Sequence, residues 1–344
     1  MKKCENVFAE KDELPFISVL IVVRNEQDYI KNCLRSILEQ RYPSNSFEVI
    51  IVDGESSDKT VDFAKETADK YSIRSDGTVS VKYLTNTKRK LASGWNLGIK
   101  ESKGQYVTRL DAHACASKNF LEESVKTIEA ISEAVCVGGR AESFAKTKKG
   151  RIISKVISSP FGVGNSKFRY SSKAGFVDTV GHGMYRKEIF QKVGYFNEQL
   201  KRNQDNDMHN RIRKYGGKFY YNPKIHSIYF NRETYSGLFK QGYENGKWGF
   251  YMIRNGNNAM SLRHLIPFAF ITELGFCTIL GFINKFFWKI GIATVVVHFF
   301  MGTFFAVKQT KIVNEWICMP FIFFLYHCVY GIGSLVGLTR KGEK

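Results

Sequence analysis

An apolar run, a polar turn and a helix-patterned segment recur in that order along the first third of the chain, and this repeat restricts the possible fold most strongly. The first apolar run is Phe16–Val23, rich in β-branched residues, and a helical pattern follows over Gln27–Gln40. The second run, Phe47–Val52, precedes a helical pattern over Thr60–Tyr71. Strands that alternate with helices are joined by right-handed crossovers and pair in parallel. The sequence therefore predicts an α/β fold with a mostly parallel sheet.

The repeat continues into a strand that ends in two ionisable residues. After a short strand at Val79–Leu84 and a helix at Ala92–Ser102, the strand Gln105–Leu110 is followed by Asp111 and His113. Residues two apart on an extended chain point the same way, so both side chains are expected to converge on one cation beyond the strand's carboxyl end. Open α/β sheets bind their ligands at that edge.

A second acidic residue, Asp53, follows the neighbouring strand and is expected at the same edge. It is a candidate for a hydrogen bond to a nucleobase or a ribose; the alternative is a turn carboxylate that caps the following helix. For a cation held by Asp111 and His113, carboxylate and phosphate oxygens suit Mg²⁺ or Mn²⁺, and the imidazole favours Mn²⁺. The sequence has no G-x-G-x-x-G after the first strand and no Walker G-x-x-x-x-G-K, so the main dinucleotide and P-loop signatures are missing.

The composition fits a folded and strongly basic protein. The 344 residues, 44% of them hydrophobic, suffice for one large domain or two smaller ones. Lys and Arg number 51 against 32 Asp and Glu, and the net charge of +19 favours a polyanionic partner: nucleic acid, anionic lipid or a phosphorylated substrate. The seven cysteines include no C-x-x-C pair and are expected to be reduced, in a chain whose soluble part faces the cytosol. The N-terminal residues lack the apolar core of a secretory signal, so export is not expected.

Simple periodicity is lost over residues 146–174 and returns after them. This segment is basic and rich in Ser and Gly, and it is interpreted either as a functional loop or lid or as a disordered insertion. The regular elements expected around it are strands at Val135–Gly139, Phe176–Val180 and Lys218–Tyr221, a turn at Gly181–Gly183, and helices at Lys187–Val193 and Met208–Tyr215.

From Leu265 onward the chain becomes strongly apolar. Leu265–Ile283 has one charged residue, and Ile290–Val307 and Trp316–Leu338 have none. Spanning the hydrocarbon takes about 20 apolar residues, so two or three membrane helices are predicted, with a re-entrant or interfacial hairpin as the alternative for the first two. The preceding Tyr235–Arg254 interleaves aromatic and basic residues, which is typical of a segment on a lipid surface or of an amphipathic helix packed on the domain. Three spans would place the basic C-terminal residues outside, against the positive-inside tendency, whereas two spans would return them to the cytosol.

Several stretches, taken in order, resemble one enzyme family. They are SVLIVVRNE with IIVDGESSDKT, RKLASGWNLGI, DAHA and RNQDNDMHNRIRKYGGK. Over about Phe16–Arg232 the chain thus resembles the inverting nucleotide-sugar glycosyltransferases of family 2. The stretches SSPFGVGNSKFR, DTVGHGMYRKEIF and RNQDND are most similar to bacterial members that build succinoglycan-type exopolysaccharide on a lipid carrier. The resemblance implies a GT-A fold with a Rossmann-like sheet. Together with the apolar pattern after Leu265, it divides the chain into a tail at 1–15, a catalytic domain at 16–232, an interfacial segment at 233–264 and a membrane region of two or three helices at 265–340.

Carried over residue by residue, the resemblance implies a nucleotide-sugar site, a metal site and a catalytic base. The residues it assigns are Val23, Asn25, Glu26 and Asp53 in the uridine pocket, Lys90 and Asn96 nearby, Asp111 and His113 at the metal and the diphosphate, and Asp205 as the base.

Two positions depart from the family pattern. His113 replaces the second Asp of the usual Asp-x-Asp, and Gln204 replaces the Glu that usually precedes the base. Because Gln204 cannot ionise, the base role falls on Asp205, with Asp207 as a second candidate. The alternative for Asp205 is a cap on the helix expected at Met208. His182 either contacts the diphosphate or occupies a turn.

The activity that the resemblance implies is transfer of one sugar from a UDP-sugar to a saccharide carried on a polyprenyl diphosphate lipid, at the cytosolic face of the cytoplasmic membrane and with no nucleic-acid partner. A carboxylate would deprotonate the acceptor hydroxyl while the cation neutralises the leaving diphosphate.

One alternative is transfer to a polyprenyl monophosphate, which needs no base. Another is a non-catalytic, membrane-tethered protein whose basic surface binds nucleic acid or anionic lipid. Gln241, Lys247 and Trp248 lack the spacing of the Gln-x-x-Arg-Trp element of processive synthases, so processive polymerisation is not predicted.

Overall fold

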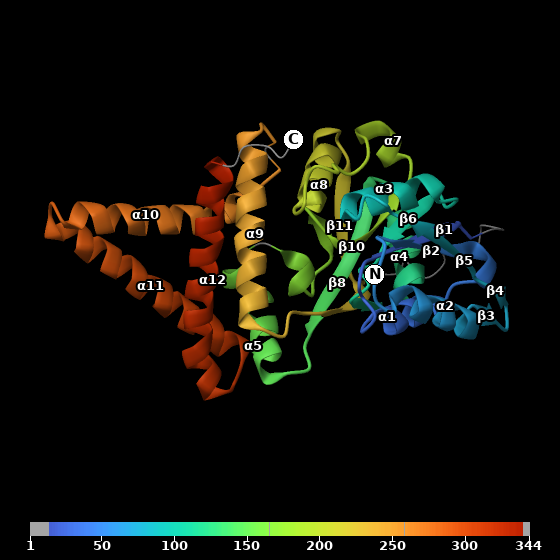
Figure 1. The fold of residues 1–344 in the computed structure, drawn as a ribbon, viewed down its shortest axis with the longest axis horizontal. Helices are drawn as coiled ribbons and strands as arrows, with labels where there is room; N and C mark the ends of the chain where they lie inside the picture. The colour runs from blue at the N-terminus through green and yellow to red at the C-terminus, as the bar shows by residue number, and fades with distance from the viewer. Residues whose placement is uncertain (1–13, 165, 258, 340–344) are drawn as a thin grey trace. The chain divides into compact units, whose positions relative to one another are not determined.

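The chain folds into two compact units in a computed structural model that describes residues 14–164, 166–257 and 259–339 (Figure 1). Unit 1 lies within residues 1–142 and 167–230. Unit 2 lies within residues 143–166 and 231–344. Residues 143–166, which sequence analysis placed in the catalytic domain, therefore cluster with the C-terminal part of the chain.

The first half of the sheet in unit 1 is parallel, as predicted. Its order is β5-β2-β1-β6, with β5 at Ser80–Thr85, β2 at Phe47–Asp53, β1 at Ile17–Val23 and β6 at Tyr106–Arg109. Val23 pairs with Asp53, and Asp53 pairs with Thr85, so these strands end level with one another. Leu20 of β1 pairs with Arg109, which places Asp111 at the same carboxyl edge.

The second half of the sheet is antiparallel and continues the order as β10-β8-β11-β7, with β9 paired to β11. Met184 of β10 pairs with Thr108 of β6, and β10 runs in the opposite direction. The first residues of β10 therefore lie beside the residues that follow β6. The strands are β10 at Gly181–Arg186, β8 at Ala134–Phe144, β11 at Lys218–Phe230, β7 at Ala114–Ala116 and β9 at Gly175–Val177, and β3 at Ile73–Arg74 pairs with β4 at Gly77–Thr78 in a separate ribbon.

Helices cover both faces of this sheet. Side chains alternate along β1, so Val19 and Ile21 belong to one apolar core and Leu20 to the other. The first core takes side chains from α1 at Ile30–Leu38, α2 at Thr60–Tyr71 and α4 at Phe120–Ala130. The second takes side chains from α3 at Leu91–Glu101, α7 at Ile189–Val193 and α8 at Gln204–Lys214.

Several local predictions in the middle of the chain are wrong. Residues 146–174 are not one irregular segment, because they contain α5 at Lys148–Ile157, α6 at Pro160–Val163 and a short 3-10 turn at Lys167–Arg169. The strand expected at Phe176–Val180 stops at Val177, and the expected turn Gly181–Gly183 opens β10 instead. Helix α4 was not predicted. Helix α8 begins at Gln204 rather than at Met208, so the acidic residues before Met208 lie within its first turn.

Unit 2 is helical and contains the predicted membrane region. Its apolar core joins α5 to the long C-terminal helices through Ile153, Val156, Leu238 and Phe323. Among residues 14–164, 166–257 and 259–339, three helices are long and apolar enough to cross a membrane, which confirms that prediction by length and composition. The three helices are α10 at Ile266–Gly281, which follows a 3-10 turn at Leu262–His264, α11 at Lys285–Gln309 and α12 at Val313–Thr339. They are preceded by a fourth, more polar helix, α9 at Tyr235–Arg254.

Candidate functional site

The carboxyl edge of the parallel strands carries unusual backbone conformations. In the described part of the chain, five non-glycine residues have positive φ: Asn25, Glu55, Arg89, His182 and Asn203, with φ of 55°, 55°, 54°, 44° and 62°. The first three follow β1, β2 and β5, His182 lies at the start of β10, and Asn203 precedes α8. Left-handed backbone at such residues costs on the order of 1–3 kcal/mol each and is concentrated at functional sites. The strain therefore marks the loops at this edge.

The loops after β1 and β2 are joined through Asn25 and Asp53. The Asn25 amide N–H donates to Ser56 Oγ at 2.9 Å, and the Ser57 N–H donates to Asn25 Oδ1 at 2.9 Å. Ser56 Oγ donates to Asp53 Oδ1 at 2.6 Å, and Gly54 N–H donates to the Val23 carbonyl at 2.8 Å. The structure thus brings three residues of the predicted nucleotide pocket, Val23, Asn25 and Asp53, into one connected turn.

The alternative role for Asp53, a cap on the following helix, is not found. The Thr60 N–H at the start of α2 donates to Asp58 Oδ1 at 3.0 Å. The carboxylate of Asp53 accepts instead from Ser56, in the turn before that helix.

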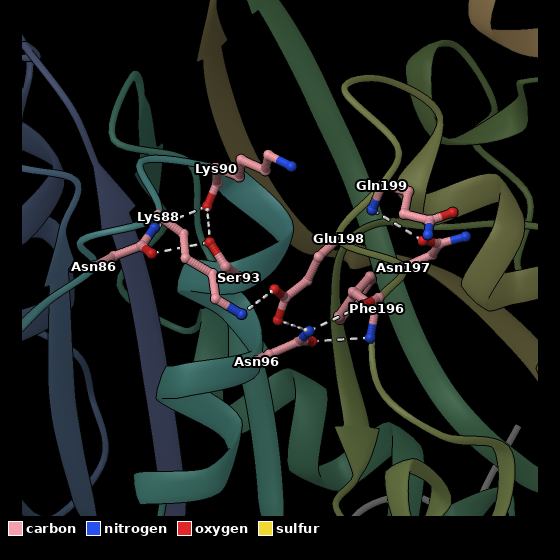
Figure 2. A network of polar contacts seen from close by, with 9 residues as sticks. All are labelled: Asn86, Lys88, Lys90, Ser93, Asn96, Phe196, Asn197, Glu198 and Gln199. Carbon is pink, nitrogen blue, oxygen red and sulfur yellow. Dashed lines mark hydrogen bonds and ion pairs between the residues drawn. The ribbon is translucent and has the colours of Figure 1, made fainter. Parts of the chain in front are cut away.

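Asn96 lies on α3, Lys90 directly precedes that helix, and the two residues make different contacts (Figure 2). The Lys90 carbonyl accepts from Asn86 Nδ2 and from Ser93 Oγ, both at 2.8 Å, while its exposed side chain extends away from these groups. The Asn96 amide nitrogen donates to the Phe196 carbonyl at 2.9 Å and to Glu198 at 3.0 Å. The Phe196 N–H donates to Asn96 Oδ1 at 2.8 Å. Both ends of the buried Asn96 amide therefore bind the loop that precedes α8.

Asp111 and His113 belong to a cluster that also contains Glu26. His113 Nδ1 lies 3.4 Å from Glu26 Oε1, and His113 Nε2 lies 2.9 Å from the Tyr229 hydroxyl. Asp111 Oδ2 lies 3.5 Å from His182 Nε2, whose ring is held by Ser227 Oγ at 2.8 Å from Nδ1. The structure thus brings Glu26, Asp111 and His113 together. His182 lies in a strand beside Asp111 and not in a turn.

The charges in this cluster shift two pKa values. Burial raises the pKa of the Asp111 carboxyl, but the hydrogen bond and charge of His182, with the charges of His113 and Arg109, outweigh it and hold that pKa well below its usual range. Burial lowers the pKa of His113, but the hydrogen bond to Glu26 and the neighbouring Tyr229, Asp111 and Glu26 raise it to about 10. Near neutral pH the cluster therefore pairs an ionised carboxylate with a protonated imidazole.

The donor atoms of the cluster fit a divalent cation that also binds a diphosphate. Among the described residues no group of three or more His, Cys, Asp or Glu side chains is arranged to hold a metal ion. Mg²⁺-type sites use one or two protein carboxylates together with substrate phosphates, so a full protein cage is not required. Asp111 would supply the carboxylate, and its side chain is 35% exposed. His113 is the predicted second ligand, and to bind a metal it would have to lose its proton and release Glu26 or Tyr229.

Asp205 lies in the first turn of α8 and is paired with a buried arginine. Its Oδ1 lies 2.7 Å from Arg109 Nη1, and the Arg109 side chain is only 6% exposed. The guanidinium group lies over the rings of Trp95 at 4.0 Å and Phe196 at 4.9 Å. Burial lowers the pKa of Arg109, but Asp205 and neighbouring groups raise it above its ordinary value, so the arginine stays charged. The side chain of Asp205 is half exposed and therefore open to a ligand.

The two other roles considered for the acidic residues of α8 are not found. Asn203, not Asp205, occupies the cap position of α8. Asp207, the second candidate for the base, has a side chain that is 4% exposed and lies 2.9 Å from Arg211 Nη2. The Asp207 carboxylate thus forms an ion pair with another residue of the same helix.

Sequence analysis missed Arg109 and Tyr229 and left His182 undecided. Arg109 had a signal, because a charged residue inside an otherwise apolar strand and two positions before Asp111 is expected to point toward the same edge. Tyr229 had none, because it lies at the end of β11, more than a hundred positions from His113.

Comparison with known proteins places the chain in a family. Residues 18–194 match the family described as glycosyl transferase family 2. A dolichyl N-acetyl-alpha-D-glucosaminyl phosphate 3-beta-D-2,3-diacetamido-2,3-dideoxy-beta-D-glucuronosyltransferase of Methanococcus voltae is 30% identical over 330 residues, which cover 94% of this chain and 98% of that protein. The succinoglycan biosynthesis protein ExoA of Rhizobium meliloti is 27% identical over 281 residues, covering 79% and 81%.

A solved structure shares the fold. The mannosyltransferase PcManGT from Pyrobaculum calidifontis, in complex with GDP-Man and Mn²⁺, aligns with a TM-score of 0.58 and 16% identity over 95% of this chain and 91% of that chain. The predicted GT-A architecture is therefore confirmed. The chain belongs to glycosyl transferase family 2.

Proposed function

We propose that this protein transfers a sugar from a UDP-sugar to a saccharide carried on a polyprenyl diphosphate lipid, with inversion at the anomeric carbon. One observation carries the proposal: Arg109 pairs with Asp205 at 2.7 Å and lies two residues before Asp111. A half-exposed carboxylate suited to an acceptor and a carboxylate suited to a metal diphosphate are thereby fixed to the end of one strand.

The donor would bind at the carboxyl edge of β1, β2 and β6. Asn25 and Asp53, connected through Ser56, offer polar groups for the uridine, beside Val23 and Glu26. The exposed Lys90 ammonium is a candidate partner for the diphosphate, and Asn96 would shape the pocket by holding the loop at Phe196. Asp111 and His113 would hold Mn²⁺ or Mg²⁺, which supplies charge neutralisation for the departing diphosphate.

The acceptor would be activated by Asp205. Its carboxylate takes the proton of an acceptor sugar hydroxyl as the hydroxyl oxygen attacks the anomeric carbon from the face opposite the diphosphate. The bond from the anomeric carbon to the diphosphate oxygen breaks in the same displacement, and the configuration inverts. Arg109 holds one oxygen of Asp205, so the other oxygen is oriented toward the acceptor.

A lipid-linked acceptor is supported by two kinds of evidence. The name of the Methanococcus voltae relative includes a dolichyl phosphate-linked sugar, and the name of the Rhizobium meliloti relative includes succinoglycan biosynthesis. The described part of this chain also contains three helices of membrane-spanning length and composition. We place the catalytic unit at the cytosolic face of the cytoplasmic membrane, where an exopolysaccharide or another cell-surface glycan would be built.

The test begins with donor binding to the full-length protein. We expect a thermal-shift panel of UDP- and GDP-sugars to show stabilisation by a UDP-sugar with Mn²⁺ or Mg²⁺, and loss of it in Asp111→Ala. Stabilisation that persists undiminished in Asp111→Ala would remove this residue from the metal site. A protein that binds no nucleotide sugar with either metal would favour the non-catalytic, polyanion-binding alternative.

The second stage offers the bound donor a polyprenyl diphosphate-linked saccharide and, separately, a polyprenyl monophosphate. Transfer to the saccharide that fails in Asp205→Asn supports the proposal. Transfer to the monophosphate that is unchanged in Asp205→Asn would replace it with the polyprenyl-phosphate alternative, because a phosphate oxygen needs no general base.

A further inference from the structure

Helices α9 and α12 of unit 2 run side by side and in the same direction (Figure 1). A Cβ built on Gly333 would overlap the Tyr243 carbonyl, and one built on Gly337 would overlap the Lys247 carbonyl. A step of four residues along α9, from Tyr243 to Lys247, thus corresponds to a step of four residues along α12, from Gly333 to Gly337. Gly246 on α9 makes the reciprocal contact with α12, where a Cβ would overlap the Tyr330 carbonyl. The two backbones touch through small residues, so they share one orientation relative to any membrane.

Helix α9 is too polar to cross a bilayer. Its 20 residues include Lys240, Glu244 and Lys247 in the middle, and Arg254 at the end. Charged residues inside spanning helices are rare and costly. Because α12 lies along α9, a spanning α12 would carry these charges into the hydrocarbon.

Helices α10 and α11 form a hairpin that stands away from α12. Near the start of α10, the Pro267 carbonyl lies against Gly331, and near the end of α11, Gly302 lies against Pro320, where a Cβ would be 3.1 Å from the Pro320 Cα. These two contact points are about three helical turns, roughly 16 Å, apart along α12. At the far end the hairpin closes, because Trp288 Nε1 donates to the Thr278 carbonyl at 3.2 Å. The three helices therefore form a triangle with α12 as one side (Figure 1).

Helix α12 is more buried inside the protein than the hairpin of α10 and α11. Only 17% of the most apolar window is buried inside the protein in the segment Leu262–Gly281, which contains α10, and in α11, against 44% for α12. The exposed large residues of α12 include Ile317, Phe321 and Leu325, spaced by four, so they form one stripe on the helix. A helix that is apolar along one exposed stripe and packed on other sides suits the boundary between headgroups and acyl chains.

Basic residues lie at both ends of the hairpin. Arg254 and Arg263 precede α10, and Lys308 and Lys311 lie at the end of α11 and just beyond it. The closed end has Lys285 and Lys289 beside Phe282 and Ile283, which are 78% and 81% exposed. Lys and aromatic residues at both ends of an apolar stretch are typical of two membrane interfaces.

We propose that the chain crosses the bilayer twice, through α10 and α11, and that α12 lies beside α9 in the interface. The occupant of the exposed hairpin surface is then the lipid bilayer. Both ends of α12, and hence the C-terminal end of the chain, are on the side of the membrane that the catalytic unit occupies. This arrangement places Arg254, Arg263, Lys308 and Lys311 on the catalytic side and Lys285 and Lys289 on the far side, so it follows the positive-inside tendency more closely than three spans do.

The test uses the full-length protein with an epitope tag at each end, in sealed inverted membrane vesicles and in intact spheroplasts. We expect a membrane-impermeant protease to remove both tags in the inverted vesicles and neither tag in spheroplasts. One tag removed in each preparation would overturn the proposal, because it places the ends on opposite sides. This readout needs no activity, so it fails or succeeds independently of the proposed transferase.

A second measurement locates the closed end of the hairpin. Ile283→Cys should react with a membrane-impermeant maleimide in spheroplasts but not in inverted vesicles, read by mass spectrometry of the peptide. Ile312→Cys, 54% exposed just before α12, is the matched control and should react only in inverted vesicles. Labelling of both positions from the same side would overturn the two crossings.

Discussion

Replacing Asp205 by Asn tests the proposed base most directly, because Asn keeps the shape of the side chain and removes only its ability to take a proton. General-base catalysis contributes about 10²–10⁴-fold, so we expect kcat to fall by that factor, or about 3–5 kcal/mol of transition-state stabilisation. Donor binding should change little, because Asp205 is not one of the groups assigned to the nucleotide or the metal.

The same substitution also weakens the pair with Arg109, and this effect must be separated from catalysis. Removing one partner of a buried pair costs about 3–5 kcal/mol, but the Asp205 side chain is 48% exposed, so solvent screens the charge. The Asn carbonyl can still accept from Arg109 Nη1 at about the same position. We therefore expect a loss of about 1–2 kcal/mol in unfolding free energy, measurable by denaturant titration.

The matched control is Asp207→Asn, two residues further along the same helix. Asp207 is more buried, at 4% exposure, and it pairs with Arg211, so its substitution should destabilise the protein at least as much. The kcat of Asp207→Asn should stay within about threefold, because the Asp207 side chain is buried and is not assigned to the donor or the acceptor site. Initial rates of sugar transfer at saturating donor, measured well below the melting temperature, compare the two. Asp205→Asn with more than half of the native kcat, or Asp207→Asn with the larger catalytic loss, would refute the assignment.

Three further predictions follow from the described contacts. In Asp111→Ala, the stabilisation by a UDP-sugar with Mn²⁺, about 2.7 kcal/mol at 100-fold excess over Kd, should disappear in thermal-shift measurements. The pKa of His113 is raised to about 10, so the stability that protonated His113 contributes is fully present below the ordinary pKa of histidine and is lost as pH rises through about 10. In the metal-free protein, His113→Asn should therefore flatten the dependence of unfolding free energy on pH over this range, measured by denaturant titration. Gly246→Ala should destabilise unit 2 by about 1–3 kcal/mol because its Cβ would meet the Tyr330 carbonyl, whereas Gly275→Ala, with open space around its Cα, should be neutral in the same melting assay.

The parallel half of the sheet was predictable because its strands are buried on both faces. Continuous apolar runs such as Phe16–Val23 and Phe47–Val52 read as central strands, and parallel neighbours must end at one edge. The pairing of Val23 with Asp53 is therefore a consequence of the pattern and not of any one residue. The same reasoning placed Asp111 at that edge.

The antiparallel half was not predictable from local pattern. Gly181 and Gly183 around His182 suggested a turn, because glycine is common in turns. In the structure these glycines allow close contacts: a Cβ on Gly183 would lie 2.8 Å from Cys136 Sγ of the neighbouring strand, and one on Gly181 would lie 3.1 Å from the Phe168 ring in the 3-10 turn at Lys167–Arg169. The reason for both glycines lies in residues distant in sequence, which a single-sequence pattern does not contain.

The position of the proposed base depends on two residues that sequence analysis assigned to other roles or missed. Asn96 holds the backbone of Phe196 through two hydrogen bonds, and the Phe196 ring covers the guanidinium of Arg109 at 4.9 Å. Arg109 in turn binds Asp205 at 2.7 Å. Helix α3 and strand β6 thus fix the start of α8 at successive points, and β6 also leads directly to Asp111. A rigid strand, rather than a loop, would therefore set the separation between the metal-binding carboxylate and the base, which is the separation that an in-line displacement at the anomeric carbon requires.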